Sequence, residues 1–213
     1  MDLTLAPELG DVLAVGVLRV DGTRVVAHEA SLDAPLAEAE RRLRDAPDRS
    51  ETVTAVRQLY RAVGLDPTKT RPSSEALLRR IRKGEGLPRI NGVVDVGNWC
   101  SAETQLPFGL YDVDRIEGPI DVRVGRAGEE YAGIGKDVVH VAGRITLADR
   151  VGPFGNPTSD SARTRVSETT ARVLVVVYAP RPGGVAAVAR ALTLTATRLE
   201  QFTGGTEAGR QVI

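Results

Sequence analysis

The sequence predicts an α+β fold in which helices pack on a β-sheet. Three observations indicate it: strand-like segments open the chain, helical patterns follow, and strand-like segments fill most of the second half before one last helix. Grouped helices and strands are typical of α+β proteins, whereas a parallel βαβ array would alternate them. With 213 residues, 42% of them hydrophobic, the chain is long enough for one substantial core.

The composition narrows the class of protein. The formal net charge is +0, so no whole-molecule field favours nucleic acid, although a local basic patch is compatible with that total. The single cysteine, Cys100, excludes an internal disulfide and suits a reducing compartment. No charged-then-apolar leader opens the chain, and no apolar run reaches membrane-spanning length. We therefore expect a cytoplasmic protein that does not contact a membrane.

The first part of the chain predicts a strand pair followed by two helices. Residues 11–20 form an apolar strand, and an Asp-Gly turn would let residues 24–27 pair back with it as a hairpin. Apolar residues then recur at helical spacing over residues 33–46 and again over 50–63. We expect these two segments to be amphipathic helices.

A third helix should follow, with Ser73 or Ser74 as its cap and Leu77, Leu78 and Ile81 facing inward. Its outer face and the loop before it make the most basic part of the chain. A basic face of this kind can follow the phosphates of a nucleic acid, or it can be an ordinary solvated helix surface. The candidate phosphate-binding residues are Arg71, Arg79, Arg80, Arg82 and Lys83.

The stretch over residues 91–112 is the most informative one. Apolar residues recur there at helical spacing, yet Asp95, Asn98 and Glu103 lie on the same segment, which runs into a Pro/Gly corner. Polar groups on a largely apolar helix beside such a corner predict the lining of a pocket. The alternative is that these polar side chains only cap or brace the helix.

The second half predicts strands over residues 111–113 and 120–124, and a hairpin of 138–141 with 144–147 around Gly143. Residues 172–178 are the most apolar strand and should lie at the centre of the sheet.

The polar stretch over residues 152–170 separates two of these strands. A long Gly- and Pro-rich connection inside a compact domain is often functional, and Arg163 could hold a carboxylate or a phosphate there. The alternative is a solvated loop that makes local turns. The candidate substrate-contacting residues in this stretch are Ser159, Asp160, Ser161, Arg163 and Thr164.

Other chemistries are not supported. The chain has no Gly-x-Ser-x-Gly elbow, no P-loop and no dinucleotide-binding fingerprint. His28, His140 and Cys100 are too few for a zinc site. We expect His28 to be exposed after a strand, and we interpret His140 as a structural residue and Cys100 as a packing residue. We expect neither a metal nor another cofactor.

The run VVDVGNWCSAETQLPFGLYD (residues 93–112) resembles the hydrolytic editing and tRNA-binding module of the phenylalanyl-tRNA synthetase beta chain. The Arg71-Pro72-Ser73 segment and residues 156–164 resemble free-standing relatives of that module. The resemblance covers roughly residues 70–178. It implies a mixed, mostly antiparallel sheet with helices packed on it.

The resemblance also implies a pocket that receives an amino acid esterified to the end of tRNA, where water cleaves the ester. Asn98 and Asp112 match the motif's asparagine and closing acid. Gly109 stands where the synthetase form usually has a histidine, which puts identical chemistry in doubt and leaves room for a larger ligand. Asp160 and Glu168 are both candidates for the acid of the far loop, and Asp160 has the more polar neighbours.

We interpret residues 1–205 as one domain of this type. Residues 1–70 would hold the N-terminal strand pair and helices, 71–178 the core that resembles the family, and 183–203 a C-terminal helix. Residues 206–213 would be a disordered tail.

Two functional hypotheses follow, and whether the protein is an enzyme stays open between them. In the first, it binds aminoacyl-tRNA and hydrolyses a mischarged or non-protein aminoacyl ester, with Asn98 and Asp160 as catalytic residues and Glu103 assisting. In the second, which the histidine-to-glycine difference favours, it only binds an amino acid, an adduct or a tRNA end. It could also be a subunit of a larger complex. No DNA partner is expected.

Overall fold

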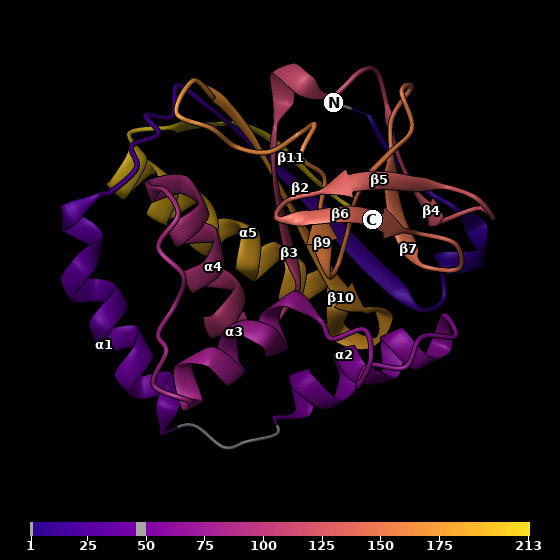
Figure 1. The fold of residues 1–213 in the computed structure, drawn as a ribbon, viewed down its shortest axis with the longest axis horizontal. Coiled ribbons are helices and arrows are strands. Elements are labelled where there is room, and N and C mark those ends of the chain that lie inside the picture. The colour runs from indigo at the N-terminus through magenta and orange to yellow at the C-terminus, as the bar shows by residue number, and fades with distance from the viewer. Residues whose placement is uncertain (1, 46–49) are drawn as a thin grey trace.

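The computed structural model describes residues 2–45 and 50–213, and it confirms the α+β fold (Figure 1). A four-stranded antiparallel sheet has the order β11-β2-β10-β3. A five-stranded sheet has the order β1-β4-β7-β8-β9, with β1 parallel to β4 and the other pairs antiparallel. Strands β5 and β6 form a separate ribbon. The predicted mixed, mostly antiparallel arrangement is therefore confirmed.

The strands have the following bounds: β1 Leu3–Leu5, β2 Leu13–Asp21, β3 Phe108–Asp112, β4 Ile120–Val124, β5 Glu130–Gly133, β6 Lys136–His140, β7 Ile145–Ala148, β8 Pro153–Asn156, β9 Ser159–Asp160, β10 Arg172–Pro180 and β11 Thr206–Val212. The helices are α1 Asp33–Arg44, α2 Glu51–Ala62, α3 Ser73–Arg82, α4 Gly92–Thr104 and α5 Arg181–Thr203, with short 3₁₀ turns over Pro7–Leu9, Ala30–Leu32 and Val113–Arg115.

Strands β2 and β10 carry the core because both of their faces are covered. Val173, Val175 and Val177 point into a cluster shared with α4 and α5, whereas Leu174 and Val176 point into a second cluster shared with the five-stranded sheet. Burial on both faces explains why β10 reads as a nearly continuous apolar run. The predicted central position of this strand is correct.

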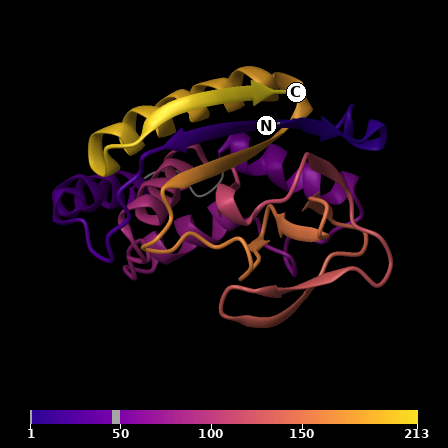
Figure 2. The ribbon, with the colours of Figure 1, turned by 90° about the horizontal axis from the view of Figure 1, so that it is seen from above.

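The C-terminal residues are ordered, so the prediction of a disordered tail is wrong. Strand β11 pairs antiparallel with β2 and runs beside α5 (Figure 2). The expectation failed because β11 is polar and exposed along most of its length. It is held by backbone hydrogen bonds to β2, which a burial-based pattern does not detect.

Two predicted hairpins are also wrong. Residues 24–27 form no strand, and β2 pairs with β10 and β11 instead. Strand β6 pairs with β5, while β7 pairs with β4 and β8, so residues 138–141 and 144–147 do not pair with each other. In each case the turn signal marked a change of direction but did not specify the partner: β2 pairs with strands from the C-terminal part of the chain, and β6 pairs with the strand before it rather than the one after it.

Candidate functional site

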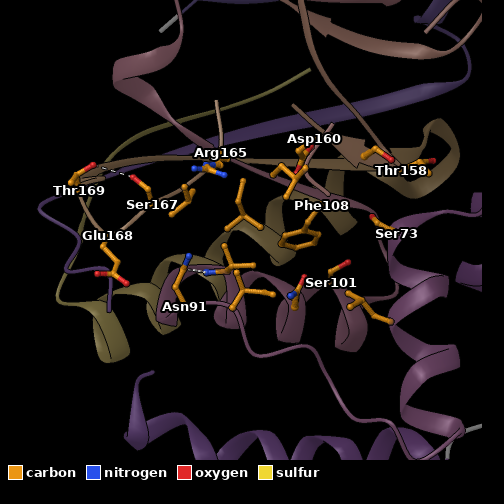
Figure 3. Close-up of a pocket in the computed structure, with 18 residues that line it drawn as sticks. Ser73, Asn91, Ser101, Phe108, Thr158, Asp160, Arg165, Ser167, Glu168 and Thr169 are labelled. Carbon is orange, nitrogen blue, oxygen red and sulfur yellow. Dashed lines mark hydrogen bonds between the residues drawn. The ribbon is translucent and has the colours of Figure 1, made fainter. Parts of the chain in front are cut away.

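A cavity of about 690 Å³ lies between helix α4 on one side and β3, β9 and the segment 165–169 on the other (Figure 3). A cavity of this size is within the range of small-molecule binding sites. It is lined by Ser73, Leu77, Ile90, Asn91, Val94, Asn98, Ser101, Phe108, Leu110, Ile134, Thr158, Ser159, Asp160, Arg165, Val166, Ser167, Glu168 and Thr169.

Helix α4 supplies one wall through a single face. Asn91 caps the helix, because its side-chain oxygen accepts a hydrogen bond of 2.9 Å from the Val94 amide. Ser101 donates to the Leu106 carbonyl at 2.7 Å. Asn98, between them, makes no hydrogen bond to any residue that the structure describes. Its amide is therefore the group on this wall that can bind a ligand.

Asp160 lies on the opposite wall, in β9. The Tyr111 hydroxyl donates a hydrogen bond to its Oδ1 atom. Burial raises the pKa of Asp160 to about 7, because it disfavours the charged carboxylate more than the hydrogen bonds from Tyr111 and the Leu110 amide favour it. The group therefore exchanges its proton near neutral pH while its residue remains partly exposed to the cavity.

The other candidates from the polar stretch have structural partners. The Ser161 and Thr164 hydroxyls are buried and lie 2.8 Å apart. Arg163 makes two hydrogen bonds of 2.9 Å to the buried carboxylate of Asp149, so it is committed to that ion pair. Only Ser159 and Asp160 from this set of candidates line the cavity.

Two candidates at the Pro/Gly corner also lie outside the lining. Asp112 is buried and accepts hydrogen bonds from the Thr170 hydroxyl at 2.8 Å and the Asp114 amide at 3.0 Å. A Cβ atom built on Gly109 would lie 2.3 Å from the Tyr111 hydroxyl oxygen. The room expected at Gly109 is therefore already filled by the Tyr111 side chain, and the expectation of space for a larger ligand is wrong.

Glu103 faces the other side of α4. Its carboxylate accepts a hydrogen bond of 2.5 Å from Arg198 of α5 and lies 3.5 Å from Arg42. The Arg198 guanidinium also stacks over the Trp99 ring at 3.5 Å from its centroid. Glu103 is therefore not among the residues that line the cavity, and its position does not support the predicted assisting role there.

Two lining residues were not among the sequence candidates. Arg165 is exposed at the cavity and makes no ion pair with another described residue. The Ser73 hydroxyl is buried and finds no hydrogen-bond partner within the described ranges. No local signal separates Arg165 from Arg163, because their difference depends on the distant Asp149. Glu168, the alternative candidate for the far-loop acid, also lines the cavity.

The basic residues of α3 lie partly in ion pairs. Arg80 contacts Glu85 at 3.1 Å, Lys83 contacts the same carboxylate at 3.9 Å, and Arg71 contacts Glu75 at 3.6 Å. Arg79 has no carboxylate partner in the described part of the chain. A second cavity, of about 260 Å³, lies between α2 and α3 and is lined by Arg57, Arg79, Arg82 and Lys83 among others.

The structure limits two other kinds of site. Over residues 2–45 and 50–213, no group of three or more His, Cys, Asp or Glu side chains is arranged to hold a metal ion. Among the helices described, none has both the length and the apolar character needed to cross a membrane. Cys100 is buried, and burial raises the pKa of its thiol, so it is a packing residue rather than a nucleophile.

Comparison with known proteins identifies relatives. A sequence profile described as "B3/4 domain" matches residues 55–212. The phenylalanine–tRNA ligase beta subunit of Thiobacillus denitrificans is 28% identical over 217 residues, covering 97% of this chain and 27% of that protein. The beta subunit of Bartonella henselae is 30% identical over 124 residues, covering 57% of this chain and 15% of that protein. The chain thus spans less than a third of the length of these relatives.

A solved structure gives the same relationship at the level of the fold. An N-terminal fragment of the phenylalanyl-tRNA synthetase beta subunit from Pyrococcus horikoshii superposes with a TM-score of 0.52 and 18% identity. The match covers 97% of this chain and 50% of that fragment. The likeness extends over almost the whole chain, including the elements that form the cavity.

Proposed function

The chain belongs to the B3/4 domain family, and from that premise we propose that its cavity binds the aminoacyl end of an aminoacyl-tRNA and hydrolyses the ester. The relatives are subunits of a ligase that acts on tRNA, and this supports tRNA or aminoacyl-tRNA as the partner. The small ligand in the cavity would be the amino acid that the tRNA carries.

The observation that carries the proposal is the pairing of two polar groups across one cavity. Asn98 on helix α4 and Asp160 on strand β9 both line this cavity. The walls between them are largely apolar, with Val94, Phe108 and Leu110 among the lining residues. An apolar pocket with a few convergent polar groups, one of which has a strongly perturbed pKa, is typical of an active site.

These groups suit ester hydrolysis by water. The Asp160 carboxylate takes a proton from a water molecule as the water oxygen bonds to the ester carbonyl carbon. The Asn98 amide donates to the carbonyl oxygen as negative charge develops on it. The bond from the carbonyl carbon to the ribose oxygen then breaks, and the proton on Asp160 passes to that oxygen. A base whose pKa lies near the working pH is well matched to this role.

Cationic side chains outside the apolar part would hold the tRNA. Arg165, at the cavity, has no ion-pair partner among the residues described and can meet a phosphate near the tRNA end. Arg79 on α3 pairs with no carboxylate in the part of the chain that the structure describes, and it can meet a phosphate of the tRNA backbone. Arg80 and Lys83 would have to leave Glu85 to do so.

The test is deacylation of a panel of correctly and incorrectly charged aminoacyl-tRNAs by the purified protein. We expect release of one class of amino acid, lost in Asn98→Ala and in Asp160→Asn. Glu103→Gln is the matched control, because Glu103 lies on α4 but faces away from the cavity. Release that survives both cavity variants would place the chemistry elsewhere.

The alternative is a binding module without catalysis, favoured by the glycine at position 109. Its signature in the same panel would be tight binding of one aminoacyl-tRNA without release of the amino acid. Equilibrium binding measured on the same samples therefore separates the two functions. The Asn98→Ala variant should weaken binding if the cavity holds the ligand in either case.

A further inference from the structure

The Tyr111 side chain lies in a slot between two glycines. Tyr111 is fully buried, and its ring meets Phe154 edge-on at 5.1 Å between centroids. A Cβ atom on Gly109 of β3 would lie 2.3 Å from the Tyr111 hydroxyl oxygen, and one on Gly155 of β8 would lie 2.1 Å from it. Real Cβ atoms do not approach other atoms so closely, so any larger residue at either position would displace the phenol.

The slot places the Tyr111 hydroxyl beside one oxygen atom of Asp160. Gly155 is the register partner of Asp160 in the β8–β9 ladder, so the phenol passes across Gly155 to reach the Asp160 side chain. There it donates to Oδ1. The two glycines, the tyrosine and the aspartate come from three strands, and their arrangement serves this single contact.

The backbone that carries Asp160 is fixed by other groups. Asn156 accepts hydrogen bonds from the Thr158 and Ser159 amides at 2.8 and 3.0 Å. The Tyr131 hydroxyl donates to the Ser159 carbonyl at 2.5 Å. The turn between β8 and β9 therefore keeps its shape without Tyr111, and the Tyr111 hydroxyl acts on the carboxyl group itself.

We propose that Tyr111 is a positioning residue: together with the Leu110 amide it hydrogen-bonds the Asp160 carboxyl group, and by holding Oδ1 it orients the carboxylate to take the proton from water. This inference rests on the proposed function and adds a residue to it. It also explains the glycine at position 109, because a histidine or any other side chain there would exclude the Tyr111 hydroxyl.

The titration of Asp160 can be measured separately from that of the groups that face it. They are the hydroxyls of Tyr111 on β3, Tyr131 on β5 and Tyr178 on β10, and the Arg165 side chain lines the same cavity. Burial raises the pKa of all three tyrosines above its usual value, so they stay neutral throughout the neutral range. A titration near pH 7 in this cluster belongs to Asp160.

The test is Tyr111→Phe, which removes only the hydroxyl. Because a hydrogen bond to the charged form is lost, the midpoint of the Asp160 titration, followed by ¹³C NMR of its carboxyl carbon, should move up by about one pH unit or more. The acidic limb of the rate profile should move with it, so kcat at a pH below the midpoint falls about tenfold and recovers at higher pH. KM should be unchanged.

Tyr178→Phe is the matched control, because it removes a fully buried hydroxyl that lies beside Tyr111 in the same core but does not hydrogen-bond the Asp160 carboxyl group. An unchanged Asp160 midpoint in folded Tyr111→Phe would overturn the inference. The NMR titration needs no turnover, so it remains decisive even if no aminoacyl-tRNA is hydrolysed and the proposed function fails.

Should Tyr111→Phe not fold, 3-fluorotyrosine placed at position 111 gives the same answer in an otherwise native chain. Its ¹⁹F signal should shift with the Asp160 midpoint, and this shift should disappear in Asp160→Asn. A ¹⁹F signal that does not respond near that pH would overturn the inference.

Discussion

Helix α4 has one face that packs toward α5 and one that lines the cavity, and the polar side chains on these two faces differ in their hydrogen bonding. Toward α5, Glu103 is paired with Arg198, which stacks on Trp99. Toward the cavity, Asn98 has no partner among the described residues, and Asp160 on the facing wall keeps a proton to about pH 7. The interactions toward α5 stabilise the fold, whereas the cavity side retains the Asn98 amide as a group that can bind a ligand. A polar residue on an apolar helix marks a site only when its direction leaves it without a partner.

The largest expected effect is on turnover after Asp160→Asn, which replaces the proposed base by an isosteric amide. Loss of general-base catalysis typically lowers kcat by roughly 10²- to 10⁴-fold. Single-turnover deacylation of the preferred aminoacyl-tRNA measures it, with circular dichroism as the folding control. A variant that keeps wild-type turnover would remove Asp160 from the mechanism.

The two faces of α4 can be separated by one variant on each. Asn98→Ala should lower kcat by about 10²-fold, as removal of an oxyanion donor does, with little change in unfolding free energy. Glu103→Gln should leave kcat unchanged but lower the unfolding free energy by about 1–3 kcal/mol, because it weakens a charge-assisted hydrogen bond.

Both quantities are obtained from the same two proteins, by deacylation and by urea unfolding. The proposed difference between the two faces would be contradicted if Glu103→Gln lost activity without losing stability. It would also be contradicted if Asn98→Ala lost stability without losing activity.

The cavity-facing carboxyl should also reduce stability as pH rises. Burial raises the folded-state pKa of Asp160 to about 7 from its ordinary value of 3.8, so the folded state binds more protons than the unfolded state between these two pH values. Stability attributable to this group is therefore present below about pH 4 and is lost as pH rises to about 7.

Relative to wild type, Asp160→Asn should gain about 1–3 kcal/mol at pH 8, allowing for solvent at the open side of the cavity, and little at pH 4. Urea unfolding of both proteins at the two pH values measures the difference. An equal difference at both would contradict the raised pKa.

The smallest expected effect concerns the basic face of α3. Arg79→Ala should weaken tRNA binding several-fold and lower the slope of log affinity against log salt by about 1, if its guanidinium meets a phosphate. Arg190→Ala on α5 is the control, because it also removes an exposed positive charge, but from another helix. The same slope in both variants and in wild type would exclude α3 from the tRNA contact.

The local sequence pattern predicted some features of the site but not others. The spacing within α4 indicated a helix with polar groups beside a corner, and that helix forms a cavity wall. The same spacing did not tell Asn98 from Glu103, because which face meets α5 depends on Arg198, 95 residues away from Glu103 in sequence. Likewise, Arg163 and Arg165 are indistinguishable until Asp149 takes one of them.

The sequence by itself determined the fold class, the helices and the buried strand over Arg172–Pro180, because apolar periodicity and capping residues act over a few neighbouring positions. Only the tertiary structure decided which strands pair, where the polar C-terminal strand docks and how Tyr111 reaches Asp160 between Gly109 and Gly155. These features depend on contacts between segments far apart in the chain, and no local pattern encodes which distant partner satisfies a given polar group or fills a given space.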